Sequence, residues 1–150
     1  MPRPCKCRRV GFVPDATLFK PAGIPARDLP EVALALDELE ALRLADLEGL
    51  YHEQAAARMG VSRQTFGNVV AAARRKTADC LVNGKVLRIA GSAVQAGEGE
   101  FVCGSCRHRW RQDAGAPPPA RCPACRRGTG RAGAGRRVHE RSQSTQGETQ

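Results

Sequence analysis

The sequence has few aromatic residues: only six of its 150 residues are Phe, Trp or Tyr. This scarcity argues against a large aromatic-rich core and against a base-stacking platform. Long apolar runs are also missing, since no stretch approaches the roughly 18 consecutive apolar residues that a membrane span needs. The opening MPRPCKCRR is positively charged but has no apolar segment behind it, unlike a secretory leader. We therefore expect a cytoplasmic chain with no membrane partner.

The patterns of common catalytic sites are absent as well. We find no nucleophile–base constellation, no phosphate-cradling glycine loop and no H-E-x-x-H metal motif. The three histidines, His52, His108 and His139, are scattered and lack the neighbours that catalysis would require. We expect no enzymatic activity.

Acidic residues are outnumbered by basic ones. The chain has 15 Asp and Glu against 24 Lys and Arg, which gives a formal net charge of +9. This excess favours a polyanionic partner, because basic side chains displace the counterions condensed on phosphates. Charge alone does not choose between DNA, RNA and an acidic membrane surface.

Composition divides the chain into five segments. Residues 1–36 form a proline-rich arm that should be extended or turning, with a short strand over 9–13. Residues 37–90 carry helical periodicity and end on a weakly alternating stretch, 85–89, which is a candidate partner for the first strand. Beyond them lie a linker at 91–99, the paired cysteines within 100–128, and a basic tail at 129–150 that has too little apolar surface to order itself.

The first predicted helix begins at Asp37. Its carboxylate can cap the free N–H groups while Glu40, three residues later, reaches back in a capping box. Gly49 sits where this helix should end. Six leucines fall on or beside one face, which we expect to pack in the core: Leu36, Leu39, Leu42, Leu44, Leu47 and Leu50.

A short helix, a glycine turn and a longer helix follow. The short helix covers 53–59, Gly60 suits the positive φ of a tight turn, Val61 offers an apolar plug and Ser62 can cap the next helix. Small residues at 55–57 would let the two helices cross closely. This order is that of a helix-turn-helix, whose second helix projects into a DNA groove. Helical proteins of other functions share these features, so this part alone leaves both interpretations open.

The third helix is amphipathic in a way that favours a DNA reader. Arg can pair with guanine, and Gln or Asn with adenine, at base edges in the major groove. Residues of these types share one side with two small residues: Arg63, Gln64, Gly67, Asn68, Ala71 and Arg75. The opposite stripe should face the core: Phe66, Val69, Val70, Ala73, Thr77, Cys80 and Leu81.

Gly67 is informative because a glycine in a helix costs roughly 1 kcal/mol relative to Ala. Together with Ala71 it would leave room for DNA, although a local bend or close packing against another protein would also explain it. The basic run Arg74-Arg75-Lys76 would lie over phosphates, with a solvated basic face as the alternative. The predicted DNA-binding residues are Ser62, Arg63, Gln64, Thr65, Gly67, Asn68, Arg74, Arg75 and Lys76.

These motifs resemble known proteins. The segment QAAARMGVSRQTF, residues 54–66, resembles region 4 of sigma-70-type factors and related helix-turn-helix repressors. The motifs PRPCKCRRVGF, FKPAGIP, LDELEALRLADLEGL and GVSRQTFG together resemble an uncharacterised prokaryotic family of predicted DNA-binding proteins, over residues 2–90. The resemblance implies a mainly α fold of the winged-helix-like superfamily and transcription-related DNA binding, without naming an operator. It does not cover the paired cysteines.

Four of the seven cysteines form two pairs, Cys103 with Cys106 and Cys122 with Cys125. The pattern C-x2-C-x15-C-x2-C matches a tetrahedral four-thiolate zinc site, and in a reducing compartment it favours metal ligands over disulfides. This segment resembles a zinc ribbon. About 27 residues cannot form an adequate core alone, so the metal would supply much of the folding energy. The predicted zinc is structural, since four protein ligands leave no open position.

Other features around the cysteines leave alternatives open. Iron is the rival metal, because four thiolates also suit a rubredoxin-like centre. His108 is surplus to a four-sulfur site. Cys5 and Cys7 are either metal ligands or reduced thiols, while Cys80 falls on the apolar stripe as a small core residue. Six arginines surround the pairs and suit either nucleic acid or a soluble protein-docking tag: Arg107, Arg109, Arg111, Arg121, Arg126 and Arg127.

The sequence thus supports two main hypotheses. The first is a transcription regulator that binds double-stranded DNA as a homodimer, since one helix-turn-helix contacts few bases. The second is an adaptor that docks on RNA polymerase or another protein through its helices and cysteine segment. A redox carrier built on the cysteines is a third and weaker hypothesis. Target sequence, effector and the choice between activation and repression are not encoded in any pattern we find.

Overall fold

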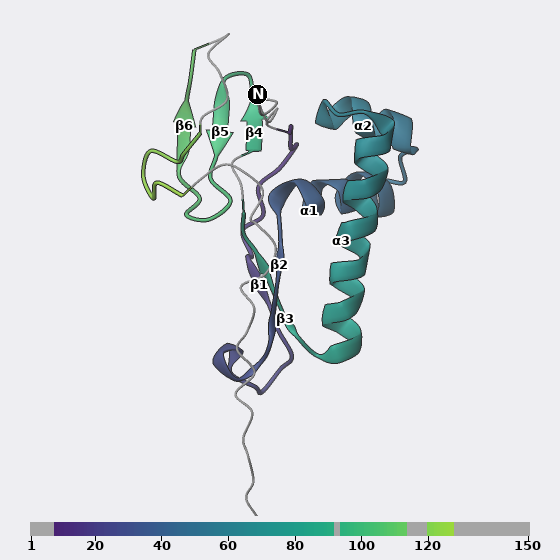
Figure 1. Cartoon of the computed structure of the whole chain (residues 1–150), viewed down its shortest axis with the longest axis vertical. Coiled ribbons are helices and arrows are strands. Elements are labelled where there is room, and N and C mark those ends of the chain that lie inside the picture. Colours follow the sequence, from purple (N-terminus) through teal and green to yellow (C-terminus); the bar gives the residue numbers. More distant parts are fainter. Residues whose placement is uncertain (1–7, 92–93, 114–119, 128–150) are drawn as a thin grey trace, which may run out of the picture.

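The computed structural model describes residues 8–91, 94–113 and 120–127 (Figure 1). These residues form three α-helices, two short turns of other helix types and two small three-stranded sheets. None of the helices in the described part of the chain is long and apolar enough to cross a membrane. The predicted mainly α fold therefore describes only the central part of the molecule. Cys5, Cys7 and the predicted basic tail at 129–150 lie outside the described residues.

The helices and strands follow one another along the chain as follows. The helical elements are η1 (Ala26–Asp28, 3-10), α1 (Leu36–Leu42), η2 (Arg43–Leu47, π-helical), α2 (His52–Met59) and α3 (Arg63–Asn83). The strands are β1 (Leu18–Phe19), β2 (Glu31–Leu34), β3 (Val86–Ile89), β4 (Val94–Gly97), β5 (Glu100–Val102) and β6 (Arg109–Arg111).

The three α-helices enclose the first of two apolar clusters. In Figure 1, α3 is the long helix, and α1 and α2 lie against its first half. Small side chains on α2 allow the close crossing that the sequence predicts. The expected core stripe of α3 is confirmed except at its end, where Leu81 is 80% exposed because α3 extends past α1 and α2. The buried members of this cluster are Ala41, Leu44, Ala55, Ala56, Met59, Phe66, Val69 and Val70.

The start of α1 differs from the prediction. The helix begins one residue early, at Leu36, and the Glu38 carboxylate accepts the Ala35 N–H at 2.9 Å, so the predicted Asp37–Glu40 capping box is wrong. Asp37 instead forms an ion pair with Arg8. The helix then continues as η2, whose wider turn rotates Leu47 away from the core and leaves it 81% exposed. Gly49, at φ +71°, follows the end of this helical segment as predicted.

The first sheet brings the arm and the end of the helical region together. Its central strand, β3, confirms the strand predicted at 85–89, but its partners are β1, antiparallel, and β2, parallel. The predicted partner at 9–13 is wrong, because Arg9 makes only a bridge to Gln95 in the second sheet. Parallel pairing of β2 with β3 requires the whole helical region as its crossover connection.

The second sheet, in the order β4-β5-β6, holds the cysteine segment. Strand β4 lies within the stretch that has linker composition. The arm runs beside it: the Val10 N–H donates to the Gln95 carbonyl at 2.9 Å, and the Gln95 N–H donates to the Arg8 carbonyl at 3.0 Å. On its other side the Arg9 N–H donates to the Met59 carbonyl at 3.1 Å.

The second apolar cluster joins the two sheets. It consists of Val10, Leu36, Ile89, Val94 and Val102. These residues come from the arm, α1, β3, β4 and β5, so helical region and cysteine segment share buried surface. The cysteine segment is therefore packed against the helical region and is not a separate unit.

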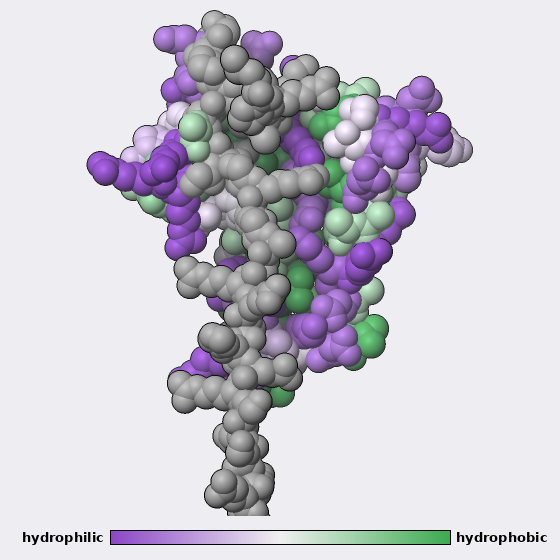
Figure 2. Space-filling view, viewed as in Figure 1, coloured by the Kyte–Doolittle hydropathy of each residue, from purple (hydrophilic) through white to green (hydrophobic). Residues whose placement is uncertain are grey.

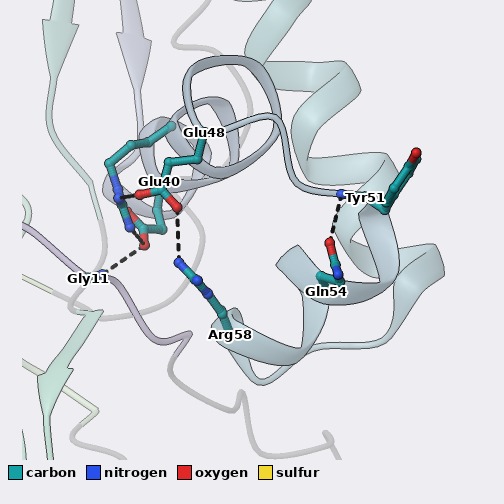
Figure 3. A network of polar contacts seen from close by, with 7 residues as sticks. Gly11, Glu40, Glu48, Tyr51, Gln54 and Arg58 are labelled. Carbon is teal, nitrogen blue, oxygen red and sulfur yellow. Dashed lines mark hydrogen bonds and ion pairs between the residues drawn. The ribbon is translucent and has the colours of Figure 1, made fainter.

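A buried carboxylate ties the arm to the helices (Figure 3). Glu40 is 2% exposed and accepts hydrogen bonds from the Gly11 N–H and from Arg43 Nε and Nη2, each at 2.8 Å. Arg43 also pairs with Glu48, which accepts from Arg58 Nη1 on α2 at 3.0 Å. A Cβ at residue 11 would lie 2.7 Å from Arg43 Nη2 and 3.1 Å from Glu40 Oε1, so a larger residue there would displace the ends of these two side chains. Arm, α1, η2 and α2 thus share one polar network.

We expect Glu40→Ala to destabilise the protein by about 3 kcal/mol, because it leaves the Gly11 N–H and the Arg43 guanidinium without their buried acceptor. Urea denaturation measures the change. Glu53→Ala is the matched control, since Glu53 is exposed on α2. Equal losses of unfolding free energy for the two variants would contradict the structural role of Glu40.

Candidate nucleic-acid interface and metal centre

The turn between α2 and α3 is built as the sequence predicts. Gly60 adopts φ +67° and ends α2, and the Val61 N–H donates back to the Ala56 carbonyl at 3.0 Å. Ser62 caps α3, because its Oγ accepts the Thr65 N–H at 3.1 Å. The two hydroxyls of Ser62 and Thr65 also lie 2.8 Å apart. These two predicted DNA-binding residues therefore hold the first turn of α3 in shape.

Four of the predicted base or phosphate contacts share the outward side of α3. Their side chains make no hydrogen bond or ion pair with the rest of the described chain. The opposite side of the helix is the core stripe, so tertiary packing orients this polar side toward solvent. The four are Arg63, Gln64, Asn68 and Arg75, all exposed.

Gly67 lies between these residues and is half-buried. A Cβ built there would meet only His52 Nδ1, at 3.9 Å, which is an ordinary contact. The His52 ring itself is held edge-on against Phe66, with 5.2 Å between ring centroids. Packing within the described chain therefore does not require glycine at this position.

The three residues of the basic run Arg74-Arg75-Lys76, at the middle of α3, differ in whether they have an acidic partner. Arg74 donates to Asp46 of η2 at 2.7 and 3.1 Å, and Lys76 donates to Glu38 of α1 at 2.8 and 2.9 Å. The hydrogen bond from Arg74 lowers the pKa of the Asp46 carboxyl below its usual value. Arg74 and Lys76 are therefore neutralised within the chain, while Arg75 is not. Their predicted phosphate contacts would have to compete with these pairs.

A shallow cavity of about 390 Å³ adjoins the start of α3 and was not expected from the sequence. Its lining includes Arg63 and Arg74 of α3 and Tyr51 and His52 at the start of α2. Tyr51 is 81% exposed, although it is one of few aromatic residues. A large aromatic residue immediately before a helix, in a chain with few aromatic residues, is the sequence signal that could have pointed to this cavity.

The four paired cysteines meet at one point. Their sulfur atoms all lie within 4.8 Å of one another, and Cys103–Cys125 and Cys106–Cys122 are each 3.6 Å apart between Sγ atoms. His108 is not part of the cluster, in agreement with the four-sulfur prediction. Cys80 belongs to α3 and is buried, as predicted, with its Sγ 3.8 Å from the Val86 carbonyl of β3, and burial raises the pKa of its thiol.

Both cysteine pairs adopt the same local fold. In the first, the Arg107 N–H donates to the Cys103 carbonyl and the Cys103 N–H donates to the His108 carbonyl, both at 2.9 Å. In the second, Arg126 and Cys122 repeat the first of these bonds at 2.9 Å. Arg107 and Arg126 have positive φ, 66° and 56°. Two matching turns thus present two sulfurs each to a common centre.

The thiols differ in acidity. At Cys122, burial is outweighed by hydrogen bonds from the Cys125 and Ala124 N–H groups, which lower its pKa to about 7. At Cys106, the His108 N–H lowers the pKa, but burial and the neighbouring thiols outweigh it and raise the pKa to about 12. The four groups do not all ionise near neutral pH by themselves. A bound cation would compensate the charge of four thiolates, so the donor set fits a metal ion.

Comparison with known proteins identifies relatives but no activity. A family model described as "Protein of unknown function DUF134" matches residues 1–96. A UPF0251 protein of Moorella thermoacetica is 50% identical over 125 residues, which cover 83% of each chain. A UPF0251 protein of Desulfosudis oleivorans is 49% identical over 130 residues, 85% of this chain and 94% of the relative. UPF0251 protein VV2_0946 of Vibrio vulnificus is 61% identical over 89 residues, 59% of this chain and 89% of the relative.

These matches differ in how far they reach. An aligned segment that covers 85% of this chain cannot leave out residues 103–125, so the similarity to the Desulfosudis protein extends over both cysteine pairs. The family model ends before them. No solved structure matches the chain significantly.

We expect Cys106→Ser to reduce bound metal from about one ion per chain to well below one, because a hydroxyl replaces one of four thiolates. Elemental analysis of purified protein measures the content. Lowering the pH should release metal from the wild type, since protons compete for the thiolates. Cys80→Ala is the control, and its loss of metal, or full retention by Cys106→Ser, would contradict the four-sulfur site.

Proposed function

The chain belongs to DUF134, a family of proteins of unknown function, and from its own geometry we propose that it binds double-stranded DNA sequence-specifically through α3 and regulates transcription. The observation that carries this proposal is the division of α3 into a buried apolar side and an exposed side with Arg63, Gln64 and Asn68. These side chains have the hydrogen-bonding patterns that read base edges in the major groove.

The surroundings of α3 support the same function. A short helix, a glycine turn and a longer helix that pack on one another are the arrangement that helix-turn-helix proteins use to bring the second helix to DNA, and α2, Gly60 and α3 follow one another in this order. Packing within the described chain would allow a larger residue at position 67. Close approach of a DNA surface to the helix backbone would explain why this residue is glycine. The net charge of +9 would draw a duplex to the protein.

The metal in this proposal is a structural zinc ion held by Cys103, Cys106, Cys122 and Cys125. Four thiolates in a tetrahedral arrangement leave no open coordination position, so the ion would stabilise the fold of the second sheet. Iron is the alternative for the same ligands, and a visible absorption band in anaerobically purified protein would identify it.

An adaptor function is the second candidate, and exposed apolar side chains favour it. Leu81 and Val82, at the end of α3 remote from the turn, are 80% and 81% exposed, and Phe19 on β1 is 52% exposed. Figure 2 shows apolar surface near this lower end of the helix amid a largely hydrophilic face. A second copy of the chain or RNA polymerase could dock there. Such docking is compatible with DNA binding at the other end of α3.

Selection of duplexes from a random pool, followed by binding assays on two variants, tests the DNA proposal. We expect Arg63→Ala to cost about 1–3 kcal/mol at one base pair and to relax the preference there. Arg75→Ala should instead weaken all duplexes about equally, because it contacts phosphate. Identical binding profiles for the two variants would contradict these roles, and no duplex affinity at low salt would favour the adaptor function.

The Arg74–Asp46 pair supplies a further test. Asp46→Asn removes the carboxylate that holds Arg74, so we expect tighter duplex binding and a log K–log salt slope steeper by about 0.9, the value for one more phosphate contact. Asp28→Asn, an exposed site on η1, changes the net charge equally and serves as control. If both variants gain the same affinity, Arg74 makes no contact of its own.

A further inference from the structure

The second sheet has two chemically different faces. Val94 and Val102 point into the cluster shared with the arm and α1. Side chains alternate along a strand, so Phe101 on β5 and its register partner Trp110 on β6 lie on the opposite face. In Figure 1 this sheet lies on the side of the molecule away from α3.

Three rings stack along this outer face. The Phe101 and Trp110 centroids are 5.9 Å apart with 21° between the ring planes, and His108 continues the stack at 6.0 Å and 13° from Trp110. We call Phe101, Trp110 and His108 the aromatic ladder. Phe101 and Trp110 are half-buried, while His108 is exposed and leaves the end of the ladder open.

The segment that carries the aromatic ladder is rich in positive charge. Arg109 and Arg111 alternate with Trp110, so their side chains leave β6 on its other face. Since β6 is the last strand in the order of this sheet, these long side chains lie at its edge, next to the face that carries Trp110. Residues 94–127 contain six arginines and three acidic residues, an excess that outweighs the −2 charge of a zinc tetrathiolate. Among the described residues only one of the six arginines is ion-paired, Arg109 with Glu100 at 3.1 Å.

We propose that the outer face of the second sheet is a binding site for single-stranded nucleic acid, with an unpaired base stacked on the aromatic ladder and the flanking phosphates bound by Arg111 and neighbouring arginines. Aromatic rings with surrounding arginines are the combination that single strands require, because each base offers a ring face once it is unpaired. A duplex hides these faces, and an acidic peptide would use the arginines without the rings. The site is separate from α3 and does not depend on duplex binding there.

Trp110 is the only tryptophan of the chain, so its fluorescence reports on this site alone. The metal-loaded full chain is titrated at low salt with oligothymidylate and oligouridylate of about ten nucleotides, with a duplex of equal length and with polyglutamate. We expect the single strands to quench Trp110 and the other two probes to have little effect. The tighter of the two oligomers identifies DNA or RNA as the preferred strand.

Variants distinguish stacking from charge attraction. Phe101→Leu keeps Trp110 as reporter but removes part of the aromatic ladder, and Arg111→Gln removes one exposed cation; each should weaken oligomer binding about tenfold. Metal content and circular dichroism verify the fold, and if Phe101→Leu fails to fold, Arg111→Gln decides. Arg27→Gln, an exposed arginine on η1, is the matched charge control and should bind like the wild type.

Three results would overturn the proposal: no quenching by either single strand, equal quenching by polyglutamate, or an Arg111→Gln variant that binds no more weakly than Arg27→Gln. Arg63→Ala separates this proposal from the duplex proposal. It should leave oligomer binding unchanged, whatever its effect on duplexes.

Discussion

The burial of one side of α3 is the constraint on which the rest of the structure depends. Phe66 and Val70 are almost completely enclosed by α1 and α2, so α3 cannot rotate about its axis without exposing them. Full burial of such side chains stabilises a fold by roughly 1.5–3 kcal/mol each. The orientation of the opposite, polar side is therefore a consequence of core packing, so the backbone of α3 need not rearrange to present this side to a partner.

The arm connects the helices to the second sheet. Residues 8–11 are hydrogen-bonded to the end of α2 on one side and to β4 on the other, and Val10 fills the apolar cluster between them. Glu40 fixes the same segment through the Gly11 N–H. A metal ion would stabilise the cysteine turns, and β4 and β5, which precede the first of these turns, pack on the arm. Metal binding would therefore also stabilise the position of the arm against α2. The two halves of the chain are best regarded as one folded unit.

Local signals predicted much of this structure. Gly60 and the Ser62 cap lie within a few residues of the contacts that they make, the apolar stripe of α3 follows the period of the helix, and the C-x2-C spacing nearly determines its own turn. The errors involve partners distant in the sequence. Pairing of β2 with β3 joins residues separated by all three helices, and Glu40 accepts the Gly11 N–H of the arm, 29 residues away, which no pattern near the start of α1 indicates.

Composition alone does not predict two further features, the stacked aromatic rings and strand β4. The low aromatic count argued against a stacking platform, but register between β5 and β6 places Phe101 beside Trp110 and so concentrates scarce rings on one surface. Residues 91–99 have the composition of a linker, yet 94–97 form β4. This strand pairs with β5 and with the arm through backbone hydrogen bonds, which do not depend on the type of side chain.

The most direct test of duplex recognition by α3 is an NMR titration of the isotope-labelled, metal-loaded protein with a duplex selected from a random pool. If α3 reads DNA, the largest changes in backbone amide shifts will fall on the first turns of α3 and the start of α2. Shifts confined to the second sheet, or to the Leu81 end of α3, would contradict it.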